Sequence, residues 1–217
     1  MAKEKVVEVI DKFEHERLYV SLGKDLIAGV DEVGRGPLAG PVVCCAVIMP
    51  LEEDMIIEGV TDSKKLSAKK REQLAELIKE RAIAYNIAQI EPDKIDRMNI
   101  LEAVKLCMAR AVLGLNVSAK AVLVDGNDIH IDFSDLPDGV DVEYVIKGDL
   151  HSYTIGCASI VAKVYRDALM DEYAVKYPEY GFEKHKGYGT KAHIDSIKEN
   201  GPCPIHRRTF IKNFWVE

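Results

Sequence analysis

Residues 27–49 of this chain read IAGVDEVGRGPLAGPVVCCAVIM, and the rest of the sequence is organised around them. Two apolar runs rich in Val and Ile, residues 26–30 and 42–49, flank a connection of Gly and Pro residues. This pattern predicts two strands joined by a tight turn. Asp31 and Glu32 stand at the end of the first run. Because carboxylates at the end of a buried strand are costly without a compensating charge, the pair indicates a metal ion beside it.

The composition is that of an ordinary globular protein and excludes several classes. With 217 residues the chain can form one domain with a full core. No apolar run approaches the roughly 18 residues of a membrane span, and the N-terminus lacks a signal-peptide core. The five cysteines form no C-x-x-C pair. We therefore expect reduced core cysteines in a cytoplasmic protein that does not engage a membrane.

The charge is unevenly distributed. The formal net charge of −7 argues mildly against a nucleic-acid partner. Residues 181–213, however, contain seven Lys or Arg residues against three acids. A basic edge beside an acidic pocket is expected where metal-binding carboxylates meet a polyphosphate backbone. On charge alone, a solvated basic tail is the simpler interpretation.

Apolar periodicity predicts an alternation of strands and helices. Strands are expected over residues 26–30, 42–49, 82–90, 121–124 and 142–146. Helices are expected near residues 4–20, 67–81, 99–115, 151–173 and 191–200, with a short turn at Pro92. Ser67, Asn99 and Thr190 are the expected N-caps of three of these helices. The order predicts an α/β fold with a mixed sheet, and a small helical appendage at the C-terminal end.

Three of the predicted strands lead into acids. Asp31 and Glu32 follow the first, Asp125 ends the fourth, and Asp149 follows the fifth. Sites in open α/β sheets form where strand ends converge, and four carboxylates there can hold two Mg²⁺ or Mn²⁺ ions. Since neighbouring strand residues face opposite sides, Asp31 and Glu32 can share a site only if the backbone turns between them, as Gly34 would permit. Asp125 before a glycine, taken alone, equally fits an ordinary turn residue.

The glycines of the turn do not indicate a nucleotide-binding loop. A Rossmann or P-loop motif requires a helix after its glycines, whereas Pro41 and a strand-like run follow here. No Ser/His/Asp or Cys/His arrangement is evident. The residues alone therefore favour a carboxylate metal site that faces phosphate.

Seven motifs occur in an order that is typical of one family. They are GVDEVGRGPLAGPV (29–42), TDSKKLS (61–67), VLVDGN (122–127), KGD (147–149), ASIVAKVYRD (158–167), HKGYGT (185–190) and HRRTF (206–210). On these motifs the chain resembles ribonuclease HII, the type 2 ribonuclease H family, from about residue 26 to residue 210. The resemblance implies a ribonuclease H-like fold with a central mixed five-stranded sheet flanked by helices. We expect a catalytic domain over residues 1–177 and a basic, helical substrate-binding extension over residues 178–217.

The resemblance also implies an activity, the hydrolysis of the RNA strand in RNA–DNA hybrids. Asp31, Glu32, Asp125 and Asp149 match the catalytic carboxylates of the family and would bind two Mn²⁺ or Mg²⁺ ions. One metal would make the nucleophile from a bound water, and the other would stabilise the leaving 3′-oxygen. Cleavage would fall 5′ of a ribonucleotide that is followed by DNA, including a single ribonucleotide in duplex DNA, and would leave 5′-phosphate and 3′-hydroxyl ends. The expected roles are ribonucleotide excision and primer removal.

Other matched positions imply substrate contacts. The backbone of Gly34, Arg35 and Gly36 would read the 2′-hydroxyl, because only glycine lets backbone groups approach a ribose closely. Tyr188 would stack on the sugar of the next deoxynucleotide. The expected phosphate contacts are Ser63, Lys64, Arg207 and Arg208. For the two arginines, a cluster that only holds the fold together is an equal alternative.

Three alternatives remain open. A type 1 or type 3 ribonuclease H would need several consecutive ribonucleotides and would not read the junction, and a non-catalytic nucleic-acid-binding module would keep only the fold. The Gly34–Gly36 segment with Tyr188 argues against type 1, and the short stretch before the first strand argues against type 3. Retention of all four carboxylates argues against the non-catalytic module. The expected partner is an RNA–DNA hybrid or ribonucleotide-containing duplex DNA, bound by a monomer. A replication clamp is a possible further partner, but residues 210–217 show no clear pattern for docking one.

Overall fold

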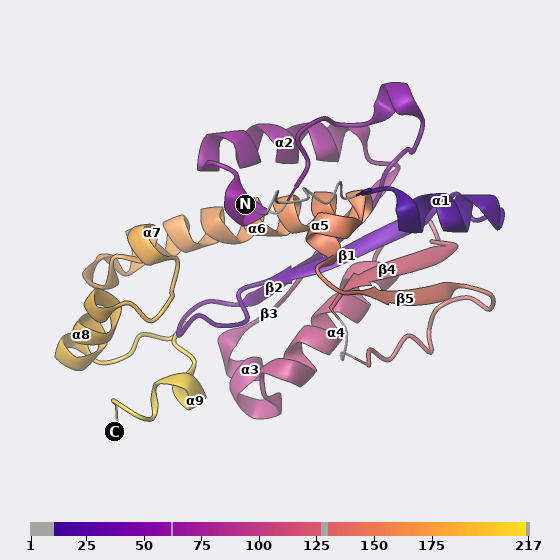
Figure 1. Cartoon of the computed structure of the whole chain (residues 1–217). Coiled ribbons are helices and arrows are strands. Elements are labelled where there is room, and N and C mark those ends of the chain that lie inside the picture. The colour runs from indigo at the N-terminus through magenta and orange to yellow at the C-terminus, as the bar shows by residue number, and fades with distance from the viewer. Residues whose placement is uncertain (1–10, 62, 127–129, 216–217) are drawn as a thin grey trace, which may run out of the picture.

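A computed structural model of the chain describes residues 11–61, 63–126 and 130–215. Its centre is a five-stranded mixed sheet in the order β3-β2-β1-β4-β5 (Figure 1). The strands are β1 (Ile27–Val33), β2 (Val42–Ile48), β3 (Ala84–Ile90), β4 (Ala121–Asp125) and β5 (Asp141–Val145). β2 is antiparallel to β1 and β3, whereas β4 is parallel to β1 and β5. The predicted α/β fold and its mixed five-stranded sheet are confirmed.

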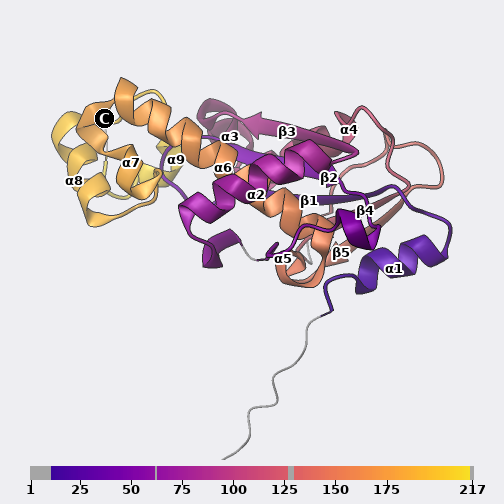
Figure 2. The same cartoon turned by 90° about the horizontal axis from the view of Figure 1, so that it is seen from above.

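Helices cover both faces of the sheet (Figures 1 and 2). α4 (Ile100–Leu113) packs on one face, and α6 (Tyr153–Lys176) packs on the other with α2 (Ala68–Arg81) against it. Because both faces are covered, every side chain of β2 is buried, which explains its unbroken apolar run. The predicted N-caps are confirmed, since the Ser67, Asn99 and Thr190 side chains accept hydrogen bonds from amides of the first helical turn.

Gly29 lets the backbone of α6 lie directly against β1. A Cβ built at Gly29 would lie 2.2 Å from the carbonyl carbon of Thr154 and 2.3 Å from the amide nitrogen of Ile155. Both atoms belong to the backbone of α6, so neither can rotate away. The absence of a side chain at Gly29 therefore sets the spacing between α6 and the strand that carries Asp31.

Several predicted boundaries differ from the structure. The N-terminal helix, expected near residues 4–20, is α1 (Glu14–Ser21); residues 1–10 lie outside the described part of the chain. The turn expected at Pro92 is instead a helix, α3 (Pro92–Met98), because proline at the first helical position needs no amide partner. The helix expected from residue 151 is divided into α5 (Gly148–His151) and α6 by Ser152. Its extended backbone ends one helix and its side chain caps the next by accepting from the Ile155 amide.

The C-terminal elements gather at one end of the sheet (Figures 1 and 2). They are η3 (Pro178–Tyr180), α7 (Phe182–His185), α8 (Lys191–Asn200) and α9 (Arg208–Ile211). They enclose a separate apolar cluster that includes Phe182, Ile197 and Ile211 and that also takes in Ala39 and Met170 from the larger part. The expected division near residue 177 coincides with the end of α6 and stays a prediction.

The remaining elements are two short 3₁₀ turns, η1 (Glu53–Met55) and η2 (Ser63–Lys65). All five cysteines are buried free thiols, as expected. Among the helices of the described residues, none combines the length and the apolar character that a membrane crossing requires.

Candidate metal centre and substrate pocket

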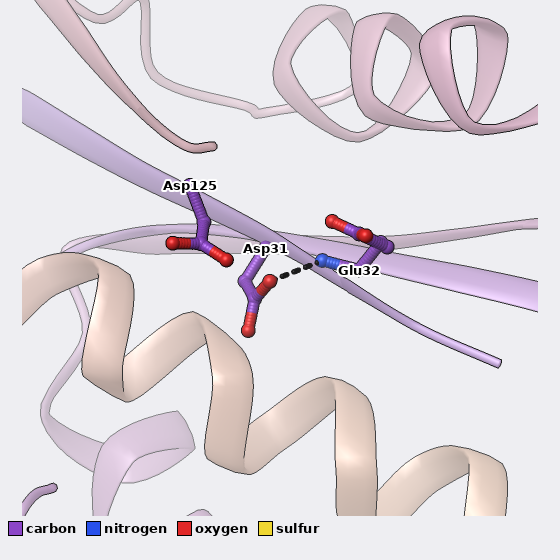
Figure 3. A group of neighbouring side chains, drawn as sticks. All are labelled: Asp31, Glu32 and Asp125. Atoms are coloured by element: carbon purple, nitrogen blue, oxygen red, sulfur yellow. Dashed lines mark hydrogen bonds between the residues drawn. The ribbon is translucent and has the colours of Figure 1, made fainter. Parts of the chain in front are cut away.

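Three carboxylates converge at one edge of the sheet. The parallel pairing of β1 with β4 sets Val30 beside Val124, so the next residues along the strands are Asp31 and Asp125. Ligand oxygens of Asp31, Glu32 and Asp125 all lie within 4.8 Å of one another. Figure 3 shows the Asp31 and Asp125 side chains side by side, with the Asp31 carboxylate turned to the Glu32 amide. This convergence of strand ends was expected for these three residues.

The way Glu32 reaches the group was not expected. The backbone does not turn between Asp31 and Glu32, because β1 stays extended to Val33 and keeps its pairing with β2 to that residue. The pairing with β4, however, stops at Val30. The longer Glu32 side chain can therefore meet the other two carboxylates past the end of β4. A hydrogen bond of 2.7 Å from the Glu32 amide to Asp31 Oδ1 fixes the shorter side chain.

Burial and mutual repulsion raise the pKa values of two of these acids. Asp31 is only 6% exposed. Loss of hydration, followed by the charges of Glu32 and Asp125, raises its pKa well above the usual range. Burial and the Asp125 charge raise the pKa of Glu32 to about 7, against a lowering by Arg35. Arg35 Nη1 lies 3.8 Å from Glu32 Oε1, and half of its side chain is exposed.

Asp149, the fourth predicted carboxylate, is not one of the three side chains that meet within 4.8 Å. It lies in α5 directly after Gly148, whose amide donates a hydrogen bond of 2.6 Å to Asp125 Oδ1. Lys147 adopts the left-handed conformation, with φ of 54°, and turns the chain from β5 into α5. Asp149 is thus connected to the carboxylate group through its neighbour's amide, and its role as a ligand stays a prediction.

The carboxylates open into a hollow of about 220 Å³ that contains other predicted residues. Its lining residues are Asp31, Glu32, Val33, Ser63, Lys64, Asp125, Ser159, Lys163 and Tyr188. Ser63 is buried, and its hydroxyl lies 3.1 Å from that of Ser159. Lys64 is exposed at the rim. The hollow therefore combines oxygen ligands with cationic groups that suit a phosphate.

Sequence reasoning missed Ser159 and Lys163 as members of this site. They lie one turn apart on α6, and the Lys163 ammonium donates to Asp167 at 2.6 Å. Both interrupt the apolar first half of α6, residues 155–164, at a spacing of four residues. That interruption was the available signal, but polar residues on one helix face equally fit a solvent-exposed stripe.

The predicted ribose-reading segment lies beside Tyr188. A Cβ built at Gly36 would lie 3.9 Å from Cε1 of the Tyr188 ring, and Tyr188 is 44% exposed. Gly34 has a φ of 90°, and a Cβ there would lie 2.2 Å from Nε of Arg166. Gly34 is therefore required by the packing of the loop itself, in addition to any requirement for space in front of a ribose.

The two arginines predicted to contact phosphate differ from each other. Arg207 is fully buried, and within the described residues its hydrogen-bond partners are the backbone carbonyls of Gly34, Arg35 and Gly40. This favours the fold-holding alternative for Arg207, with carbonyls in place of the expected ion pairs. Arg208 is exposed in α9, and its backbone amide donates to Asp96. A substrate contact by Arg208 stays a prediction.

Comparison with known proteins gives a consistent result. A family model described as ribonuclease HII matches residues 28–216. A ribonuclease HII of Leuconostoc mesenteroides is 50% identical over 210 residues, covering 97% of this chain and 79% of that protein. The crystal structure of ribonuclease H2 from Pyrococcus horikoshii superposes with a TM-score of 0.72 at 29% identity, over 84% of this chain and 92% of that one.

A second solved structure contains a partner protein. The RNase HII in a complex with PCNA from Archaeoglobus fulgidus is 27% identical and superposes with a TM-score of 0.72. The match covers 88% of this chain and 98% of that one.

Proposed function

The chain belongs to the ribonuclease HII family, and on that premise we propose that it cuts on the 5′ side of a ribonucleotide that is followed by DNA. It is a type 2 ribonuclease H, a metal-dependent endoribonuclease. This membership argues against the type 1 and type 3 alternatives and against a non-catalytic module. The proposed substrates are RNA–DNA hybrids and duplex DNA that contains single ribonucleotides.

The observation that carries the proposal is the shared hollow of the carboxylates and Tyr188. Groups suited to phosphodiester hydrolysis lie in the same space as an exposed aromatic ring. That ring stands next to Gly36, where a built Cβ would come within 4 Å of no atom except one of the Tyr188 ring. A ribose at the boundary of RNA and DNA could thus be examined beside the point where its 5′ linkage is cut.

The ligand set fits a hard divalent cation. Asp31, Glu32 and Asp125 offer only oxygen ligands, and these lie within 4.8 Å of one another. Three clustered carboxylates, one of them buried, are unfavourable without a cation between them. We propose that these three residues and Asp149 hold two Mn²⁺ or Mg²⁺ ions. When bound, the ions supply Lewis-acid activation of a water and charge stabilisation of the leaving 3′-oxygen.

The protein's own residues orient the substrate. The backbone of Gly34 to Gly36 would hydrogen-bond the 2′-hydroxyl, a group that DNA lacks. The Tyr188 ring would stack on the next sugar, where an additional hydroxyl would interfere. Lys64 and Lys163 line the hollow and would offset phosphate charge. No side-chain nucleophile is needed in this scheme.

We propose ribonucleotide excision and primer removal as the cellular roles, carried out by a monomer in the cytoplasm. Five buried free thiols suit a reducing compartment. The RNase HII of Archaeoglobus fulgidus forms a complex with PCNA, which is consistent with a sliding clamp as a further partner, although residues 210–217 of this chain show no clear clamp-docking pattern.

The decisive experiment uses three duplexes with Mn²⁺ or Mg²⁺: DNA with one ribonucleotide, a long RNA–DNA hybrid and pure DNA. We expect a cut 5′ of the single ribose, with a 5′-phosphate on the downstream product and no cleavage of pure DNA. Cleavage only within stretches of four or more ribonucleotides would overturn the proposal.

Two variants assign the roles. Asp31→Asn should abolish turnover and leave duplex binding largely intact. Tyr188→Ala should reduce kcat/KM on the single-ribonucleotide duplex far more than on the long hybrid. Tyr85→Ala is the matched control, because Tyr85 lies on β3 with nearly the same exposure, 42% against 44%. Equal loss on both substrates for Tyr188→Ala would refute its reading role.

A further inference from the structure

His206 and Arg207 are adjacent, fully or almost fully buried polar residues outside the carboxylate group. They are 2% and 0% exposed. They precede α9. A β-bridge between Ala39 and His206 joins them to the loop of residues 34–41, which connects β1 to β2. Burial of a cation and an imidazole is costly unless every polar atom is satisfied. The partners of their hydrogen bonds therefore indicate the role of these two residues.

Arg207 holds the ribose-reading loop by its backbone. Nε donates to the Gly40 carbonyl at 3.0 Å, and Nη1 donates to the Arg35 carbonyl at 3.0 Å. Nη2 donates to the carbonyls of Gly34 at 2.6 Å and Gly40 at 2.8 Å. One planar guanidinium thus fixes carbonyls at both ends of the turn, a geometry that the single ammonium of lysine cannot reproduce.

His206 is connected to Tyr188 through His193. The Cys203 amide donates to His206 Nδ1 at 2.9 Å, so the ring proton of His206 must be on Nε2. Nε2 of His206 lies 3.0 Å from Nε2 of His193, which must then accept. His193 therefore carries its proton on Nδ1 and donates it to the Tyr188 carbonyl at 2.9 Å. Only one pair of neutral tautomers satisfies this relay.

Burial is consistent with neutral rings in the relay. It lowers the pKa of His193 to about 4 and that of His206 to about 3. Both histidines are therefore uncharged at neutral pH, as the hydrogen-bond directions require.

The loop and the Tyr188 segment also contact each other directly. The Leu38 amide donates to the Gly187 carbonyl at 2.8 Å. Arg166, buried on α6, donates to the carbonyls of Pro41 and Ala39 and to that of Lys186, each at 3.0 Å. These bonds tie both segments to the helix that carries Ser159 and Lys163. Relative movement of the loop and the backbone of the Tyr188 segment would break several of them together.

We propose that His206 and Arg207 are positioning residues that fix the Gly34–Gly36 backbone and the Tyr188 ring relative to each other, and so determine the preference for a ribose followed by DNA. Arg207 acts on the loop and His206 acts on Tyr188, although neither residue touches substrate. The inference rests on the proposed junction-reading function. It goes beyond it by assigning the specificity to a buried pair in the C-terminal part of the chain.

The test compares kcat/KM on a single-ribonucleotide duplex and on a long hybrid for Arg207→Lys and His206→Asn. Arg207→Lys keeps the positive charge but loses the planar guanidinium with its several N–H donors. His206→Asn keeps an acceptor for the Cys203 amide, but its shorter side chain cannot reach His193. We expect each variant to lose on the order of 10–100-fold on the single-ribonucleotide duplex, as displaced reacting groups do. The loss on the long hybrid should be about threefold or less, a difference of at least roughly 0.7 kcal/mol.

Two further measurements separate positioning from mere stability. Ile197→Ala is the matched control, because Ile197 is fully buried in the apolar cluster of the C-terminal elements and has no part in the relay. It should lower the melting temperature and leave the ratio of the two kcat/KM values unchanged. Mn²⁺ affinity, measured by calorimetry without substrate, should equal that of the wild type in Arg207→Lys and His206→Asn.

A double-mutant cycle tests the connection to the ring. If His206 acts through Tyr188, then His206→Asn adds no further loss to Tyr188→Ala on the single-ribonucleotide duplex. Additive losses in this cycle would overturn the inference. So would an equal change in the ratio of the two kcat/KM values in Ile197→Ala and in Arg207→Lys. A wild-type enzyme without any preference for the junction would instead overturn the proposed function, so the two failures are distinguishable.

Discussion

Replacing Asp31 by asparagine should stabilise the metal-free protein while it abolishes activity. The introduced asparagine would have nearly the same shape as the aspartate, and its side-chain oxygen could still accept from the Glu32 amide. The substitution removes one of three carboxyl groups whose ligand atoms lie within 4.8 Å of one another. At that separation and an effective dielectric constant of about 20, two unit charges repel by roughly 3.5 kcal/mol.

The net gain should be smaller than the bare repulsion. Arg35 and Lys64 offset part of it, since both lower the pKa of Glu32. We therefore expect Asp31→Asn to raise the free energy of unfolding by about 1–3 kcal/mol in EDTA at pH 8. For a chain of this length, that is an increase in melting temperature of about 3–9 °C.

Mn²⁺ should remove most or all of the stability difference between Asp31→Asn and the wild type. A cation at 100 times its dissociation constant stabilises the protein that binds it by about 2.7 kcal/mol. Wild type should gain this increment with Mn²⁺, and Asp31→Asn should gain little because it lacks a buried ligand. The assay is urea or thermal unfolding of both proteins, with EDTA and with Mn²⁺.

Glu16→Gln is the control for this prediction. Glu16 is a buried carboxylate held by Ser152 and Thr154, and it is not a member of the carboxylate group. The variant should respond to Mn²⁺ as wild type does. The reasoning would be refuted if Asp31→Asn were less stable than wild type in EDTA, or if Mn²⁺ stabilised the two equally.

Other residues give independent predictions. Gly29→Ala should destabilise the protein by more than the usual 1–3 kcal/mol of overpacking, because its Cβ would meet the backbone of Thr154; chemical denaturation followed by circular dichroism measures this. Glu16→Ala should cost about 2–4 kcal/mol in the same assay, because it leaves buried donors at the start of α6 without their acceptor. Stability should also fall between pH 6.5 and pH 4. The folded-state pKa values of His193 and His206 lie below the unfolded value, so the unfolded chain takes up protons first. The loss should reach about 2 kcal/mol per histidine near pH 5, and His206→Phe should show a smaller loss in urea titrations at pH 7 and pH 5.

Local patterns identified most of the secondary structure because their causes are local. Ser67 and Asn99 cap helices through their own side chains, and the Val-rich runs form strands wherever both faces are covered. The errors occurred where two local preferences compete. Pro92 equally suits a turn and the first turn of a helix, and Ser152 divides a continuous apolar pattern by capping the second half.

The metal centre was only partly predictable for the same reason. The sequence indicates that Asp31, Glu32 and Asp125 lie at strand ends. It does not show that β1 continues past β4, which lets Glu32 join the group without a turn in the backbone. Ser159 and Lys163 were missed because their position in the hollow depends on how α6 crosses β1, and the side-chain-free surface of Gly29 determines that crossing.

By itself, then, the sequence determined the fold class, the order of the strands along the chain and the three carboxylates that meet at their ends. It also carried the motifs by which the family is recognised. Only the tertiary structure showed where Arg207, within the motif HRRTF (206–210), lies. In the sequence, the consecutive basic residues 206–208 suggest contact with phosphate. In the structure, Arg207 is buried against the carbonyls of Gly34, Arg35 and Gly40. The physical reason is that these carbonyls lie 167 to 173 residues away along the chain, and only folding brings them within hydrogen-bond distance of one guanidinium.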